Sequence, residues 1–170
     1  MDFEYEVFNK TCGICLDVDA DGSERPVLIL SACLAGVNCK YNGGNNYNEE
    51  IARLVALGNV VLVCPEQLGG CPTPRQAAEI QGGSGGDVLD GKCRVINKEG
   101  MDVTKEFIKG AQETLKIAKL TGAKKAILKS RSPSCGCGAA YDGTFSGNLV
   151  PGNGVTAELL IRNGIEVETL

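Results

Sequence analysis

The apolar positions of this chain gather in short continuous runs that are separated by stretches with helical spacing. The runs have the length of β-strands and read PVLILS, NVVLVC, KKAILK and, more weakly, GIEVETL, at residues 26–31, 59–64, 124–129 and 164–170. Runs that are apolar throughout, rather than alternating with polar residues, are typical of strands covered on both faces. We therefore expect a buried sheet built from these four segments.

Apolar residues at helical spacing predict three helices between the runs, at about 48–57, 103–121 and 154–163. The second helix carries one apolar stripe, made of Val103, Phe107, Ile108, Ala111, Leu115 and Ala118. Asp102 or Thr104 can cap its start, and Gly122 ends it. Strands that alternate with helices and short glycine-marked loops predict an α/β fold: a single three-layer domain with a mainly parallel sheet, Rossmann-like in architecture.

Two segments do not fit this pattern. Residues 1–25 show no sustained periodicity and contain the polar stretch DVDADGSER, so we interpret them as an N-terminal arm and place the domain at residues 26–170. The arm contains a C-x-x-C of Cys12 and Cys15, for which a thiol pair, an incomplete metal site and a chance occurrence all stay open. The stretch IQGGSGGDVLDG, residues 80–91, has turn composition and predicts a mobile excursion.

Composition and charge favour a cytoplasmic globular protein. Hydrophobic residues make up 43% of the chain, and no apolar run approaches the roughly 20 residues that a membrane helix needs. The acidic start MDFEYEVFNK lacks the basic and apolar parts of a signal peptide, and structural disulfides are rare in the cytoplasm. The net charge of -4 gives no overall attraction to nucleic acid. Monomer and homodimer both stay open.

One segment is locally basic. Residues 102–131 carry eight Lys or Arg against three Asp or Glu. No aromatic residues are interleaved for stacking on bases, so we interpret this segment mainly as a solvated helix face. Binding of nucleic acid is left open.

Nine cysteines and the absence of histidine limit the possible chemistry. Without an imidazole the chain cannot form a Ser-His or Cys-His nucleophilic pair, nor a Cys2His2 zinc site. Acid–base catalysis must use carboxylates, Lys, Tyr, thiols or metal-bound water. In a reducing compartment, this number of cysteines favours metal or cluster binding first and thiol redox chemistry second.

Three cysteines follow predicted strands: Cys33 comes two residues after the first, Cys64 ends the second, and Cys135 comes six residues after the third. Because the carboxyl ends of parallel strands meet at one crevice, we expect these thiolates to meet in space. Four-thiolate zinc sites usually have paired C-x2-C spacing, which these three cysteines lack, and soft thiolates also suit iron–sulfur clusters. Three ligands would leave one iron open as a Lewis acid for a sulfur-bearing substrate.

The residues beside these cysteines include candidate catalytic groups. Glu66 follows Cys64 by two residues, which in an extended segment points it to the same side, so it is the preferred acid or base; a solvated loop glutamate is the alternative. In SRSPSCGCG, hydroxyls and amides of an exposed turn can face a sulfide or an anion, with a simple Ser-Pro turn as the alternative.

The other cysteines of the domain are assigned less narrowly. Cys39 is a fourth ligand, a thiol beside the ligands or a buried structural cysteine. Cys71 and Cys137 lie near the site in sequence, but adjacency alone does not make them ligands. Cys93 is interpreted as a small core residue.

Six segments in order resemble the bacterial family typified by thiouracil desulfurase: SACLAGVNCKYNGG, VCPEQLGGCPTPR, DVTKEFIKGA, LKSRSPSCGCG, YDGTFSG and GNGVTAELLIRNGIEV. The resemblance covers about residues 26–169. It implies a stand-alone enzyme with a 4Fe-4S cluster on three cysteines, by motif position Cys33, Cys64 and Cys135. These are the three cysteines that the strand-end argument selects.

The chain departs from the family pattern at three positions. Lys40 and Asn42 stand where the family commonly has Arg and Asp, and Cys71 stands where it commonly has Leu. A lysine cannot make the forked contact that an arginine makes, so the resemblance leaves the substrate preference near this loop open.

We therefore expect a desulfidase that acts without redox turnover on a 2-thiouracil-like pyrimidine, converting it and water to uracil and sulfide while the substrate sulfur binds the open iron. Glu66 and Ser134 are the candidate catalytic residues, and Asn45, Ser132 and Tyr141 are candidates for binding the pyrimidine. Whether the small-molecule substrate is a free base, nucleoside or nucleotide, or instead a thiolated RNA, stays open.

Two other functions compete with this one. A thiol or persulfide sulfur carrier would use Cys12 and Cys15, or Cys135 and Cys137, and would need no iron. A zinc-binding nucleic-acid module would bind RNA through its lysine-rich helix in a salt-dependent way. Neither explains why three strand-end cysteines accompany Glu66.

Overall fold

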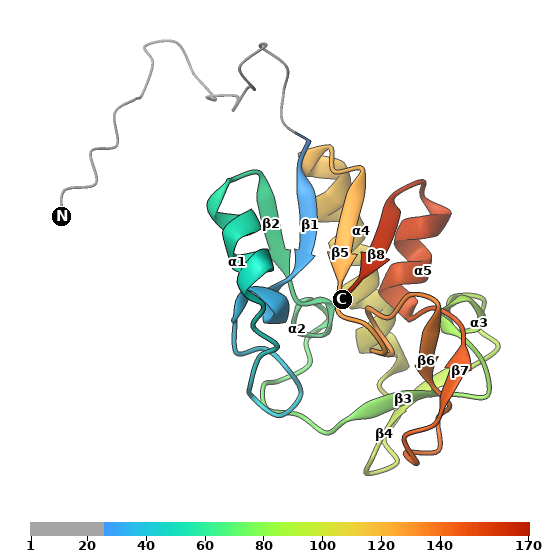
Figure 1. The fold of residues 1–170 in the computed structure, drawn as a ribbon. Helices are drawn as coiled ribbons and strands as arrows, with labels where there is room; N and C mark the ends of the chain where they lie inside the picture. The colour runs from blue at the N-terminus through green and yellow to red at the C-terminus, as the bar shows by residue number, and fades with distance from the viewer. Residues whose placement is uncertain (1–25) are drawn as a thin grey trace.

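The computed structural model describes residues 26–170, so the arm predicted at 1–25, with Cys12 and Cys15, lies outside the described residues. Four parallel strands form the central sheet in the order β2-β1-β5-β8 (Figure 1). In chain order they are β1 Leu28–Ser31, β2 Val60–Val63, β5 Lys125–Leu128 and β8 Glu166–Thr169. Each lies inside one of the four predicted runs, which confirms the mainly parallel sheet.

The three predicted helices are present within one residue of their expected ends: α1 Glu49–Ala56, α4 Thr104–Thr121 and α5 Val155–Arg162. Two neighbouring residues of β1 show which face of the sheet each helix covers. Ile29 packs with residues of α4 and α5, whereas Leu30 packs with residues of α1. Since successive strand residues point to opposite faces, the helices cover both faces and form the three predicted layers. None of the helices within 26–170 is long and apolar enough to span a bilayer.

The stretch between β2 and α4 holds short elements that the sequence patterns did not predict. They are α2 Pro65–Gly69, β3 Ala78–Gln81, α3 Gly85–Leu89 and β4 Arg94–Asn97. Strands β3 and β4 pair as an antiparallel hairpin. A second antiparallel pair, β6 Ala139–Tyr141 and β7 Leu149–Pro151, follows later in the chain.

The prediction of a mobile excursion at 80–91 is wrong, because this segment completes β3 and forms α3. A capping box between Ser84 and Asp87 starts α3, and Val88 is buried in the core. The glycines serve close packing: a Cβ at Gly85 would overlap the backbone of Gly154 at the start of α5.

Close contact between α2 and α4 fixes the end of β2. A side chain at Gly110 would overlap the carbonyl oxygen of Pro65, and one at Gly69 would overlap that of Glu106. The two helices can therefore approach only because both positions lack a Cβ. Since α2 begins directly after Cys64, this contact also sets where that cysteine lies.

Candidate functional site

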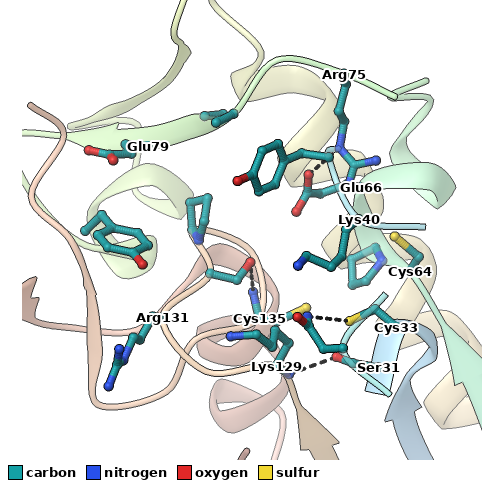
Figure 2. A pocket seen from close by; sticks show the side chains of 18 of the residues that line it. Ser31, Cys33, Lys40, Cys64, Glu66, Arg75, Glu79, Lys129, Arg131 and Cys135 are labelled. Atoms are coloured by element: carbon teal, nitrogen blue, oxygen red, sulfur yellow. Dashed lines mark hydrogen bonds and ion pairs between the residues drawn. The ribbon is translucent and has the colours of Figure 1, made fainter. Parts of the chain in front are cut away.

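A pocket of about 520 Å³ lies where β1, β2 and β5 end, and Cys33, Cys64 and Cys135 all line it (Figure 2). Cys33 sits in the 3-10 helix η1, Ala32–Ala35, which follows β1, and Cys64 is the residue before α2. Cys135 belongs to the turn after β5. The structure thus brings together the three cysteines selected from the strand ends, although they are far apart in sequence.

A fourth cysteine, Cys39, lies between two of them and is 1% exposed. Its thiol hydrogen-bonds Cys33 and Cys64 and thereby lowers the pKa of Cys33 to about 6 and that of Cys64 to about 7, although burial opposes both shifts. Asn46 adds a hydrogen bond from its Nδ2 to Cys33 Sγ at 3.6 Å. Because the thiolate is the form that binds metals, these shifts favour the ligand form of both cysteines.

Cys135 is in a different environment. Burial raises the pKa of its thiol to about 12, and a hydrogen bond with Ser31 offsets part of this shift. The hydroxyl of Ser31 also accepts the N–H of Lys129 at 3.0 Å, which ties β1 to the start of the Cys135 turn. A bound cation would favour the thiolate of Cys135 despite its burial.

The donor set of the pocket fits a cluster better than a single metal ion. Within residues 26–170, no three Cys, Asp or Glu side chains converge closely enough to hold one ion. An iron–sulfur cluster distributes its irons over a larger framework, so its cysteine ligands stand farther apart than the ligands of zinc. Cys33, Cys64 and Cys135 line the pocket together with Cys39, and thiols spread in this way fit the ligands of a cluster.

Glu66 lies in the first turn of α2 and lines the pocket. Its Oε2 accepts a hydrogen bond from Arg75 Nε at 2.6 Å, and the side chains of Glu66 and Arg75 are 18% and 8% exposed. In Figure 2 the carboxylate lies between Arg75 and Lys40. Arg75 is not among the residues predicted from the sequence, although it belongs to the motif CPTPR that follows the Glu66 segment.

The two candidate serines have different positions. Ser132 lines the pocket, and its Oγ accepts the backbone N–H groups of Ser134 and Cys135 at 3.1 and 3.2 Å. Ser134 is 1% exposed and does not line the pocket; its Oγ pairs with Thr156 Oγ1 on α5 at 2.9 Å. Ser132 therefore shapes the Cys135 turn, and Ser134 fastens this turn to α5.

Of the other two candidates for substrate binding, one lines the pocket and one does not. Tyr141, on β6, lines the pocket. Asn45 is exposed outside it and donates from Nδ2 to Asn38 Oδ1 at 2.7 Å. Its neighbour Asn46 faces the pocket instead, which the sequence alone did not indicate.

Basic groups outnumber acidic groups on the pocket wall. The acidic groups are Glu66 and Glu79, and the basic groups are Lys40, Arg75, Lys98, Lys129 and Arg131. Within residues 26–170 only Arg75 among these cations forms an ion pair. Glu79 is 7% exposed and accepts the backbone N–H of Phe145 at 2.9 Å. Among the described residues the carboxylates of the pocket therefore do not balance its basic side chains, and only the thiolates of Cys33 and Cys64 add further negative charge.

A protein-family model described as 2-thiouracil desulfurase matches residues 28–169. The chain belongs to the 2-thiouracil desulfurase family. This membership confirms the resemblance found in the motifs and the predicted enzyme class, a desulfidase. The match spans nearly all of the residues that the structure describes.

Two individual proteins are similar over most of this family domain. The uncharacterized protein YbbK of Bacillus subtilis (strain 168) is 48% identical over 141 residues, which are 83% of this chain and 93% of that protein. The solved structure of the [4Fe-4S]-dependent thiouracil desulfidase TudS (DUF523Vcz) shares 39% identity with a TM-score of 0.76. The similarity covers 85% of this chain and 91% of that one, and it confirms the α/β fold.

Proposed function

We propose that this protein is a [4Fe-4S]-dependent desulfidase that exchanges the sulfur of a thiolated pyrimidine for oxygen. The observation that carries the proposal is that Cys33, Cys64, Cys135 and Glu66 all line one pocket. The solved structure of TudS, a [4Fe-4S]-dependent thiouracil desulfidase by name, supports the same cofactor and substrate class.

In this proposal Cys33, Cys64 and Cys135 hold the cluster. When bound through three cysteines, the cluster supplies one iron without a protein ligand, a Lewis acid with affinity for sulfur. The chain supplies hydrogen bonds to the ligand sulfurs, from Asn46 to Cys33 and from Ser31 to Cys135. Such partners orient ligands and tune the group that they hold.

The reaction balances without an oxidant or a reductant: the thiocarbonyl compound and water give the carbonyl compound and hydrogen sulfide. Its proton transfers need one group that accepts a proton from water and returns it to sulfur. Glu66 suits this role because Oε2 is held by Arg75, while Oε1 forms no hydrogen bond within the described residues. Oε1 is thus the atom that we assign to proton transfer.

The charge of the pocket bears on the form of the substrate. Within residues 26–170, Lys40, Lys98, Lys129 and Arg131 form no ion pair with a carboxylate, although Lys129 lies near the thiols of Cys33 and Cys135. An uncharged base would bring no negative charge to these cations. A phosphorylated pyrimidine would bring a charged group to them. We therefore propose that the pocket accepts a thiolated nucleotide in preference to the free base.

The test is anaerobic reconstitution with iron and sulfide, followed by metal analysis, absorption spectra and turnover of thiouracil and thiouridine monophosphate. The proposal expects about four irons per chain and a broad visible band. Cys33→Ala, Cys64→Ala and Cys135→Ala should each abolish both, whereas Cys93→Ala, outside the pocket, should retain them. A colourless, iron-free wild type would overturn the proposal and favour a thiol carrier; bound zinc with salt-dependent RNA binding would favour a nucleic-acid module.

A further inference from the structure

A buried arginine links the loop after Cys33 to the helix after Cys64. Besides its bond to Glu66, the Arg75 side chain donates from Nη1 to the carbonyl oxygen of Cys39 at 3.1 Å. The same nitrogen reaches the carbonyl oxygen of Pro72 and Thr73 Oγ1, each at 3.2 Å. The backbone N–H of Arg75 donates to the carbonyl oxygen of Tyr41 at 2.7 Å. Arg75 thus ties together three segments that form one side of the pocket.

These contacts fix the direction of the Glu66 carboxylate. Glu66 is in a helix of only five residues, and its side chain has three rotatable bonds, so the helix alone would not hold it in one rotamer. The guanidinium is rigid and fastened to two backbone carbonyls, and it engages Oε2 at 2.6 Å. The other oxygen, Oε1, is left without a partner among the described residues.

We propose that Arg75 is a positioning residue for the desulfidase reaction: it acts through Glu66 by holding Oε1 in the orientation needed for proton transfer. This inference rests on the proposed function. Small displacements of a catalytic group can cost about 100-fold in rate, so the effect belongs mainly to kcat. Lysine keeps the charge but lacks the fork that contacts several oxygens at once, so it should replace Arg75 only in part.

The experiment compares Arg75→Gln, Arg75→Lys, Glu66→Gln and the double variant Arg75→Gln/Glu66→Gln in reconstituted protein. The matched control is Arg53→Gln, whose partner Glu49 lies on the surface of α1. We expect Arg75→Gln to lower kcat roughly 10- to 100-fold with KM and iron content retained, and Arg75→Lys to recover part of the loss. In the Glu66→Gln background, Arg75→Gln should lower kcat less than about twofold, because coupled residues are not additive.

If the double variant loses activity by the product of the two single losses, Arg75 does not act through Glu66 and the proposal is overturned. A rise in KM with unchanged kcat would also overturn it and would assign Arg75 to substrate binding. A loss that follows iron content would assign it to stability. A second measurement needs neither cluster nor turnover: amide hydrogen exchange of the unloaded protein at residues 39–41 and 64–71. Exchange should rise in Arg75→Gln and not in Arg53→Gln. Unchanged exchange in Arg75→Gln would refute the positioning role of Arg75. An inactive wild type, combined with the expected rise in exchange for Arg75→Gln, would refute only the proposed function.

Discussion

Glu66 has two unlike carboxylate oxygens, one held by a buried arginine and one without a partner within residues 26–170. We predict that Glu66→Gln lowers kcat by about 10²- to 10⁴-fold, because an amide cannot take the proton from water. Iron content and absorption should not change, since Glu66 is not a proposed ligand. Steady-state kinetics of the reconstituted protein check this, with Glu113→Gln on the surface of α4 as the control. A kcat close to wild type would remove Glu66 from the mechanism.

Asn46 donates a hydrogen bond to a proposed ligand sulfur, whereas the adjacent Asn45 does not. Hydrogen bonds to cluster sulfurs stabilise the reduced, more negative form and raise the reduction potential. We therefore predict that Asn46→Ala moves the midpoint potential of the reconstituted cluster to more negative values. Asn45→Ala is the matched control and should leave it unchanged. Equal potentials for both variants would show that the Asn46 contact is not made in the loaded protein.

The residues of the site could be predicted from the sequence where they follow a regular strand. They could not be predicted where an irregular loop determines which side chain faces the pocket. Cys33, Cys64 and Cys135 were selected because strand ends converge, and the structure brings them into one pocket. Nothing in the sequence distinguishes Asn45 from Asn46, since which one faces inward depends on the path of an irregular loop. Ser134 was proposed as part of an exposed turn whose hydroxyls face the site, but its side chain is buried and its hydroxyl pairs with Thr156 on α5.

At the scale of elements, the position of Cys64 depends on the contact between α2 and α4. We predict that Gly110→Ala costs about 1–3 kcal/mol or more, because its methyl group would overlap the backbone of Pro65. Forcing α2 away from α4 should also lower the iron bound per chain. Thermal unfolding and iron analysis check both effects, with Lys109→Ala, exposed on the same helix, as the control. Wild-type stability of Gly110→Ala would mean that α2 can shift freely.

The elements that could be predicted are those whose own residues show a clear period. Strands β1, β2, β5 and β8 are continuous apolar runs, and α4 buries much of the predicted stripe, including Phe107, Ala111 and Ala118. The short elements α2 and α3 have five residues each and no period of their own. Their backbones pack closely against other elements at Gly69 and Gly85, so Gly85, which lies in the segment predicted to be mobile, serves close packing instead.

At the scale of the whole molecule, charge is distributed unevenly. The chain carries a net charge of -4, yet the pocket wall has five basic and two acidic side chains. The pocket is thus a local positive region in an acidic protein, and such regions raise the local concentration of anions. The composition shows only the net charge of the chain. The excess of basic side chains in the pocket could not be predicted, because these side chains come from loops far apart in sequence.

This uneven charge gives a prediction that separates a nucleotide substrate from a free base. For thiouridine monophosphate, kcat/KM should fall several-fold as ionic strength rises from about 0.05 to 0.5 M, since salt screens the attraction of exposed charges. Uncharged thiouracil should show little change over this range. Arg131→Gln should lower kcat/KM for the monophosphate about 3- to 10-fold and leave that for thiouracil unchanged, because a single lost charge contact contributes about 1 kcal/mol. Lys105→Gln, outside the pocket, is the control. If both substrates respond alike to salt and to Arg131→Gln, the cations of the pocket do not recognise a phosphate.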